Sequence, residues 1–376
     1  MKTTSRRSGA RSLTLAAGAL LACSSCLVTP VVAAPPASLV LGNCKDKNEN
    51  NGQGRICEVQ NPPGFLVEQD AIEIQLEDGS KVKFNKKQLP AQSNGNAWFG
   101  EDENGSERAM NIVTRKGFTA ASFVTGDIIH QMATVEDGSL QVVSTPVSEF
   151  PDEGHVEDMN IEEGFEPIIE DLEFGNDRRL SSQAKTPKIP ATISNSLFRG
   201  AKMQRRNLAD DSGSVLDVMV LWTRRAECRR FTGSTSCTLS ESSRASMEAL
   251  VDLAVAETNS AYSLSGINTQ LRLVHMYRNE DYVEVSGDAY GHALDTIRAK
   301  NDGILDEVHL KRDFYGADIV AILIDDSQSC GLGYIGPSET SMFSVTGKQV
   351  YKMALAVYLG IHLIAFIFTR MSLLLH

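Results

Sequence analysis

Positively charged residues are in the minority in this chain of 376 residues, which has 36 Lys and Arg against 48 Asp and Glu. The net charge is −12 and there is no basic stripe, so we exclude nucleic acid as a partner. We also find no internal repeat. An apolar fraction of 42% is enough for packed cores, and the length fits about two or three domains.

Histidines are few and scattered, and none has a partner at a spacing typical of zinc ligands. Asp306 lies three residues before His309, but that helix must also pack through Leu305 and Val308, so we interpret the pair as structural. The sequence therefore predicts no catalytic residue and no metal ligand. The other histidines outside the acidic segment and the extreme C-terminus are His130, His275, His292 and His362.

A dinucleotide-binding motif is also lacking, although residues 331–336 read GLGYIG. Pro337 follows, and no carboxylate lies about 20 residues further on, as that motif requires. Glycines that let an edge strand bend are the better interpretation.

The N-terminus has the features of a secretory signal peptide. Arg6, Arg7 and Arg11 precede an apolar stretch at residues 13–22, and small residues follow. We expect cleavage after Ala33, since Pro35 disfavours cleavage after Ala34. Residues 1–33 are thus a predicted signal peptide, and the protein is predicted to be secreted.

Five cysteines would remain after cleavage, an odd number for an oxidising compartment. The pairs closest in sequence are Cys44 with Cys57 and Cys228 with Cys237, which leaves Cys330 unpaired. Asn104 begins an Asn-Gly-Ser sequence, a candidate glycosylation site.

Residues 34–150 are predicted to form a β-rich domain. Residues 71–76 and 81–84 alternate apolar and polar side chains around Asp78 and Gly79, which is typical of a hairpin. Residues 35–64 are rich in Asn, Gly and Pro, and we expect a loose leader there.

Residues 151–212 are predicted to be a disordered linker. No Lys or Arg occurs between Asp152 and Asp177, and few apolar residues are available for a core. Arg205 and Arg206 form a dibasic pair within this linker, a candidate processing site.

Residues 213–346 alternate between strand and helix patterns and predict an α/β domain. Strands are expected at 215–222, 270–276 and 317–324, with Cys228 and Cys237 in a loop after the first. Ser240 can cap a helix with apolar residues spaced three and four apart, and Gly266 suits its end. A second helical region, interrupted at 301–303, reaches Gly316.

Six segments of this domain share their order and pattern with one known family. They are 216–223 (LDVMVLWT), 249–262 (ALVDLAVAETNSAY) with 265–268, 271–274, 301–309, 313–326, and 330–334 with 343–345. They resemble the N-terminal subdomain of secreted metzincin zinc proteases of the reprolysin-like (M12B) group. The resemblance covers about a third of the chain.

The resemblance implies a zinc-dependent endopeptidase that acts on extracellular proteins or peptides. It implies a twisted mixed sheet, preceded by a β-rich prodomain as in a zymogen. The edge strand that pairs with an extended substrate would be Gly331, Leu332, Gly333 and Tyr334.

The resemblance also implies Zn²⁺, held by His-Glu-x-x-His-x-x-Gly-x-x-His, but this motif is absent from the chain. No ligand can therefore be assigned. In the family a second cysteine would follow Thr346 and could pair with Cys330.

The segment 347–376 becomes almost wholly apolar, and three interpretations stay open. The first is that the chain is truncated and the zinc helix has been replaced, which makes the product inactive. The second is a membrane tether through residues 353–369, either as a short span or as a lipid-anchor signal. The third is a buried helix. The alternative function is a non-catalytic, secreted or membrane-tethered protein-binding module.

Overall fold

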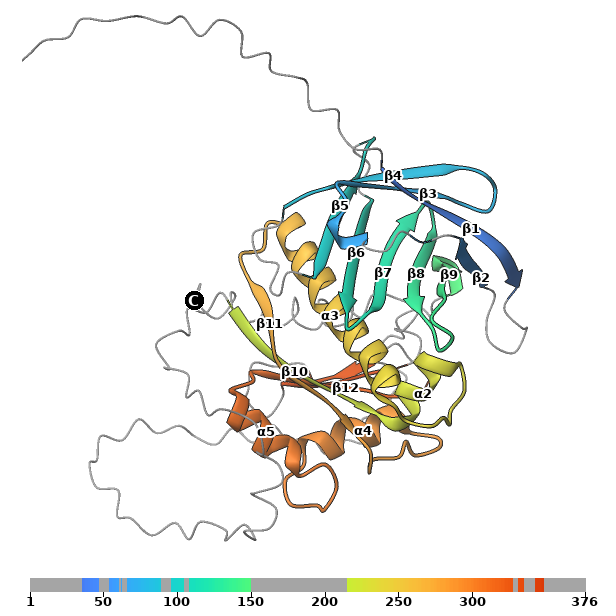
Figure 1. Cartoon of the computed structure of the whole chain (residues 1–376). Coiled ribbons are helices and arrows are strands. Elements are labelled where there is room, and N and C mark those ends of the chain that lie inside the picture. Colours follow the sequence, from blue (N-terminus) through green and yellow to red (C-terminus); the bar gives the residue numbers. More distant parts are fainter. Residues whose placement is uncertain are drawn as a thin grey trace, which may run out of the picture. The chain divides into compact units, whose positions relative to one another are not determined.

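The computed structural model describes residues 36–46, 54–60, 62, 66–88, 96–104, 108–149, 215–326, 331–334 and 342–347. These residues form a β-barrel and an α/β domain (Figure 1). The predicted signal peptide, the predicted linker and all but the first residue of the apolar tail lie outside the described residues.

Nine strands close into the barrel in the order β1-β2-β9-β8-β7-β6-β5-β4-β3. Neighbouring strands are antiparallel, except that β1 pairs in parallel with β3 to close the barrel. The strands are β1 (Ala37–Asp46), β2 (Arg55–Gln60), β3 (Ala71–Gln75), β4 (Lys81–Lys86), β5 (Ala97–Asp102), β6 (Ala109–Arg115), β7 (Phe118–Thr125), β8 (Ile128–Thr134) and β9 (Leu140–Pro146), with short 3-10 helices η2 (Leu66–Glu68) and η3 (Val147–Glu149).

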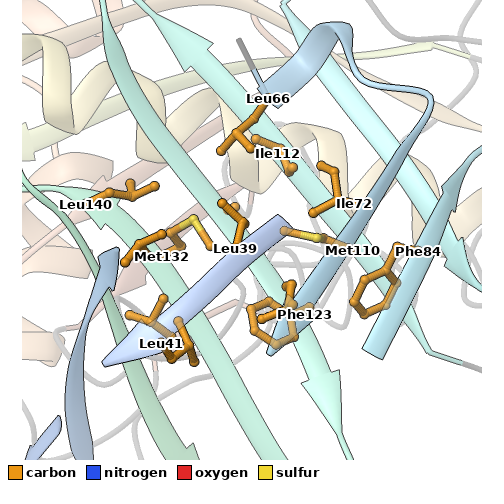
Figure 2. Close-up of a cluster of buried hydrophobic side chains, with 14 of the residues drawn as sticks. Leu39, Leu41, Leu66, Ile72, Phe84, Met110, Ile112, Phe123, Met132 and Leu140 are labelled. Carbon is orange, nitrogen blue, oxygen red and sulfur yellow. The ribbon is translucent and has the colours of Figure 1, made fainter. Parts of the chain in front are cut away.

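The barrel interior is filled by every second residue of its strands. Ile72 and Ile74 of β3 are fully buried, and Phe84 of β4 lies in the same cluster (Figure 2). Side chains alternate across a strand, so the alternation in the sequence becomes an inner and an outer face. The predicted turn between β3 and β4 is also present, with Gly79 at a φ of 82° and Ser80 N donating to Asp78 Oδ1 at 2.9 Å.

The expectation of a loose leader over residues 35–64 was wrong, because β1 and β2 are part of the barrel wall. Leu39 and Leu41 are buried in the core, and Val40 between them is only partly buried. The Cys44–Cys57 disulfide joins these two strands. Residues 43–53 are rich in Asn and charged side chains, and this composition had obscured the strand pattern in the sequence.

The α/β domain contains a five-stranded sheet in the order β11-β10-β12-β14-β13. The first four are parallel to one another, and β13 is antiparallel to β14. The fold is therefore mixed α/β and rich in strands, as predicted. Its strands are β10 (Val215–Thr223), β11 (Gln270–Asn279), β12 (Ile319–Leu323), β13 (Gly331–Gly333) and β14 (Phe343–Thr346), and its helices are α2 (Arg224–Thr232), α3 (Glu241–Leu264), α4 (Ala289–Arg298) and α5 (Glu307–Tyr315).

Helices cover both faces of this sheet, which explains its continuous apolar strands. Val220 and Trp222 of β10 pack with α3, whereas Leu221 packs in the cluster that includes α4 and α5. The sequence predicted helices over α3, α4 and α5 but missed α2. Cys228 therefore lies in a helix and not in the expected loop, and it forms a disulfide with Cys237.

Helix α3 begins and ends where the sequence predicts. Ser240 accepts a hydrogen bond from Ser243 N at 3.0 Å, and Ser243 Oγ accepts one from Ser240 N at 3.0 Å. Gly266 follows the helix with a φ of 70°, a left-handed conformation that glycine adopts without steric cost.

Candidate active-site edge

Strand β13 forms one edge of the five-stranded sheet, with β14 as its neighbour. Gly331 pairs with Thr346, Leu332 with Val345 and Gly333 with Ser344. Among the described strands only β14 pairs with β13, so β13 is an edge strand of this sheet, the position at which an added strand would pair. The two glycines have no side chains to obstruct its approach.

The inner face of this edge is anchored. Leu332 and Tyr334, two residues apart, both pack against the cluster that contains α4. The Tyr334 hydroxyl donates a hydrogen bond to Asp295 Oδ1 at 2.7 Å. Burial, together with this carboxylate, raises the pKa of Tyr334 to about 12, so the phenol stays protonated as a donor at neutral pH.

Arg298, at the end of α4, lies beside the same edge. Its guanidinium carbon is 4.7 Å from the centroid of the Tyr334 ring. Sequence reasoning missed Arg298 and Asp295. The only available signal was their position near the end of a predicted helix, and nothing in the sequence connects residue 298 with residue 334.

Gly347 continues the chain beyond β14 and is tightly enclosed. A Cβ at this position would lie 1.6 Å from the Tyr290 hydroxyl and 2.8 Å from the Asp326 carbonyl oxygen. The Tyr290 hydroxyl itself donates to that carbonyl at 3.1 Å. Only glycine leaves room for this contact, which fixes the path of the chain next to the edge.

The histidines of the described residues have structural partners. His309 Nε2 lies 2.7 Å from the Ala299 carbonyl oxygen, so it donates there, and its ring packs edge-on against Phe343. His275 stacks on Tyr315 with 3.8 Å between ring centroids. Burial lowers the pKa of His275 to about 4, with smaller contributions from nearby Lys311 and Arg244.

Within the described residues, one group of three side chains has the spacing of metal ligands: Cys44, Cys57 and Glu77. Its two cysteines are joined in a disulfide and have no thiolate to offer. The described residues therefore do not fit a zinc centre, and we derive no catalytic step through a metal.

Other predicted site residues are separate from this edge. Asn104 is exposed in the turn after β5 and donates to Asp102 Oδ1 at 3.3 Å. Cys330 and the dibasic pair Arg205 and Arg206 lie outside the described residues, as does the candidate span 353–369. No helix within the described ranges is long and apolar enough to cross a membrane.

Comparison with known proteins shows what the second domain is similar to. Residues 248–367 match the family described as metallo-peptidase family M12B, reprolysin-like. The match continues 21 residues beyond Thr346, where the sequence alone placed the end of the resemblance. A peptidyl-Asp metalloendopeptidase of Xanthomonas campestris is 35% identical over 99 residues, 26% of this chain and 23% of that protein.

A peptidyl-Asp metalloendopeptidase of Stenotrophomonas maltophilia is 36% identical over the same length, again covering 26% of this chain and 23% of that protein. The chain thus matches about a quarter of the length of these relatives. Among solved structures, metalloproteinase-II from Bacteroides fragilis is 8% identical, covers 74% of each chain and has a TM-score of 0.35, too low to establish a common fold. The resemblance seen in the sequence is thus confirmed: residues 248–367 match the model of the reprolysin-like metallopeptidases.

Proposed function

We propose that the α/β domain is the substrate-binding half of an extracellular metalloendopeptidase, with β13 as the strand that pairs with an extended peptide. The observation that carries this proposal is the antiparallel edge strand β13 at the end of an otherwise parallel sheet. Main-chain pairing at such an edge supplies affinity with little dependence on sequence.

An extracellular location is supported by the two disulfides, since these bonds persist in oxidising compartments. We propose that residues 1–33 direct secretion and that the barrel is a prodomain released from its linker by cleavage after Arg206. Both proposals come from the sequence pattern.

The family implies a metal, which would be zinc, yet the sequence has no His-Glu-x-x-His motif and the described residues contain no suitable ligand set. We propose that this chain by itself binds peptides without hydrolysing them. The alternative function is a non-catalytic protein-binding module. It is supported by the same lack of a metal-ligand set among the described residues, and it would bind its partner through the same strand, β13.

The relatives are named for cleavage at aspartate, and we propose that the peptide bound here is also acidic. Arg298 supplies a matching positive charge, because its guanidinium lies over the ring of Tyr334, the residue directly after β13. A guanidinium can bind a carboxylate through two parallel hydrogen bonds.

Pairing at the edge is tested with two peptides that have the same side chains. One is an extended Asp-containing peptide, and the other has its alternate backbone nitrogens methylated so that they cannot donate. We expect binding of the first to the 376-residue protein, measured by fluorescence anisotropy, and at least about 10-fold weaker binding of the second. Equal binding of both peptides would exclude strand pairing.

The role of Arg298 is tested separately, by comparing an Asp peptide with its Asn counterpart. The wild type should prefer Asp by about 10-fold, the order expected for a hydrogen bond to a charged group, and Arg298→Gln should remove the preference. Lys300→Gln is the matched control, because it removes an equal charge from an exposed residue two positions away. An unchanged preference in Arg298→Gln would contradict the assignment.

A further inference from the structure

Helix α3 is buried on two sides. One side packs on the sheet through residues that include Leu250 and Ala254. The other side meets the barrel, where Ala249 and Leu253 form a cluster with Val113 and Ala120, and Ala256 packs against it. Residues 249, 253 and 256 are spaced four and three apart and so lie on one stripe of the helix. This second stripe faces barrel strands β6 and β7.

Charged groups lie at one end of this apolar contact. Arg115, the last residue of β6, donates from Nε to Glu248 Oε2 at 3.0 Å and from Nη1 to Asp252 Oδ2 at 2.6 Å. Lys116 Nζ is also 3.0 Å from Glu248 Oε2. The Glu248 side chain is only 5% exposed, but the side chains of Arg115 and Lys116 are 32% and 53% exposed, so these ion pairs are partly shielded from water.

Two side-chain hydrogen bonds, one of them to a carboxylate, lie at the other end of the contact. Ser260 Oγ donates to Asn111 Oδ1 at 2.8 Å, and Ser122 Oγ donates to Glu257 Oε1. All four of these side chains are buried. Buried polar groups that are paired in this way discriminate strongly against misaligned docking, because any shift leaves them unsatisfied.

The contact between barrel and α3 is distinct from the substrate edge. Strand β13 packs on β14 and α4, whereas α3 carries the barrel. Both described disulfides close within one domain, Cys44–Cys57 in the barrel and Cys228–Cys237 in the α/β domain. Among the described residues, the contacts between the two domains are therefore noncovalent.

We propose that the outer stripe of α3 is a protein-interaction surface whose partner is the barrel, and that the barrel remains bound there after the chain is cut between the domains. Processing of residues 151–212 then yields a two-fragment complex, and release of the barrel needs a second event. Arg115 is the residue on which retention depends most, because it pairs with two carboxylates of α3 at once.

The first test cuts the complete chain. A recognition sequence for a site-specific protease is placed within residues 151–212 and cleaved to completion under native conditions. The two fragments should elute together in size-exclusion chromatography at micromolar concentration and separate only in denaturant. Two separate native peaks would overturn the proposal.

A charge exchange then tests the role of Arg115. Arg115→Glu should raise the dissociation constant of the cut complex by about 10- to 100-fold, as expected when a partly buried charge pair is broken. Adding Asp252→Arg to this variant should lower the dissociation constant again by at least about 10-fold, because the ion pair is restored with reversed charges. Failure of the second change to restore binding would contradict the assigned contact.

Two further variants serve as controls for the charge exchange. Lys81→Glu makes the same charge change on a barrel residue whose partner is Glu73 of the same barrel, and it should leave the dissociation constant within about 2-fold. Arg115→Gln removes the charge without introducing repulsion and should still weaken the complex. If Arg115→Gln and Arg115→Glu both bind like wild type, the barrel is held by other contacts and the proposal for Arg115 is wrong.

Discussion

His130 shows how a single buried side chain couples the barrel to pH. Its ring stacks on Phe123 and lies between the hydroxyls of Thr125 at 2.6 Å and Ser144 at 2.8 Å. Burial lowers the pKa of His130 to about 4. In the unfolded chain the imidazole would titrate near its usual pKa of about 6.5.

Between these two pKa values the unfolded state binds one proton more than the folded barrel. The barrel should therefore keep its full stability above about pH 6.5 and lose about 2–3 kcal/mol as the pH falls to about 4. The His130→Gln variant should not show this loss of stability between about pH 6.5 and pH 4, because glutamine does not titrate. Urea unfolding at several pH values, followed by hydrogen exchange in peptides from β8, measures the difference. Parallel curves for the two proteins would show that His130 does not titrate as described.

Gly347 is a second residue at which the surrounding atoms determine the effect of a substitution on stability. Gly347→Ala should destabilise the α/β domain by about 1–3 kcal/mol, because the added methyl group would overlap the Tyr290 hydroxyl. Tyr290→Phe removes that oxygen, so the double variant should lose less than the sum of the single changes. Thermal unfolding of the four proteins tests this coupling, and strict additivity would contradict the close contact.

One buried carboxylate connects helix α2 with several of its neighbours. Glu227 is fully buried, and it accepts hydrogen bonds from Trp222 Nε1 at 2.7 Å and from Arg278 Nη1 at 2.9 Å. It also accepts a hydrogen bond from Ser243 Oγ. The group thus connects α2 with β10, β11 and α3.

Replacing this carboxylate should loosen all four elements. Glu227→Gln should cost about 2–4 kcal/mol, since an amide has one acceptor oxygen and would direct its N–H groups at donors. Glu280→Gln is the control, because Glu280 also pairs with Arg278 but its side chain is 57% exposed; it should cost less than about 1 kcal/mol. Calorimetric unfolding measures the stability of both variants. Equal losses of stability would contradict the proposed role of the Glu227 hydrogen bonds.

Regular elements were predictable where one local signal dominates. The spacing of apolar residues and the Ser240 cap predicted α3, and the continuous apolar run predicted β12. Helix α2 was missed, because its charged sequence has little apolar periodicity and it depends on the buried Glu227. Strands β1 and β2 were missed for a different reason, since residues suited to turns surround short alternating segments.

The candidate site was predictable only in part. The position of β13 came from the resemblance to a known family and its glycines. Arg298 and Asp295 could not be found, because their relation to Tyr334 exists only after α4 packs against the edge strand. Contacts between segments far apart in sequence, such as Arg115 with Asp252, leave no local pattern either.

At the scale of the whole molecule, the chain combines a closed barrel with a sheet domain, much of which matches the reprolysin-like family model. In our proposal this domain supplies the peptide-binding edge and not the metal centre. That assignment is independent of whether the barrel stays bound after cleavage, since barrel and edge occupy different parts of the α/β domain.

The most direct test measures zinc content and chelator-sensitive hydrolysis of an Asp-containing peptide by the purified 376-residue protein. A peptidyl-Asp metalloendopeptidase of Stenotrophomonas maltophilia serves as the positive control. We expect zinc well below one ion per chain and no hydrolysis that a chelator abolishes. One zinc ion per chain together with chelator-sensitive cleavage would contradict the proposed division between peptide-binding edge and metal centre.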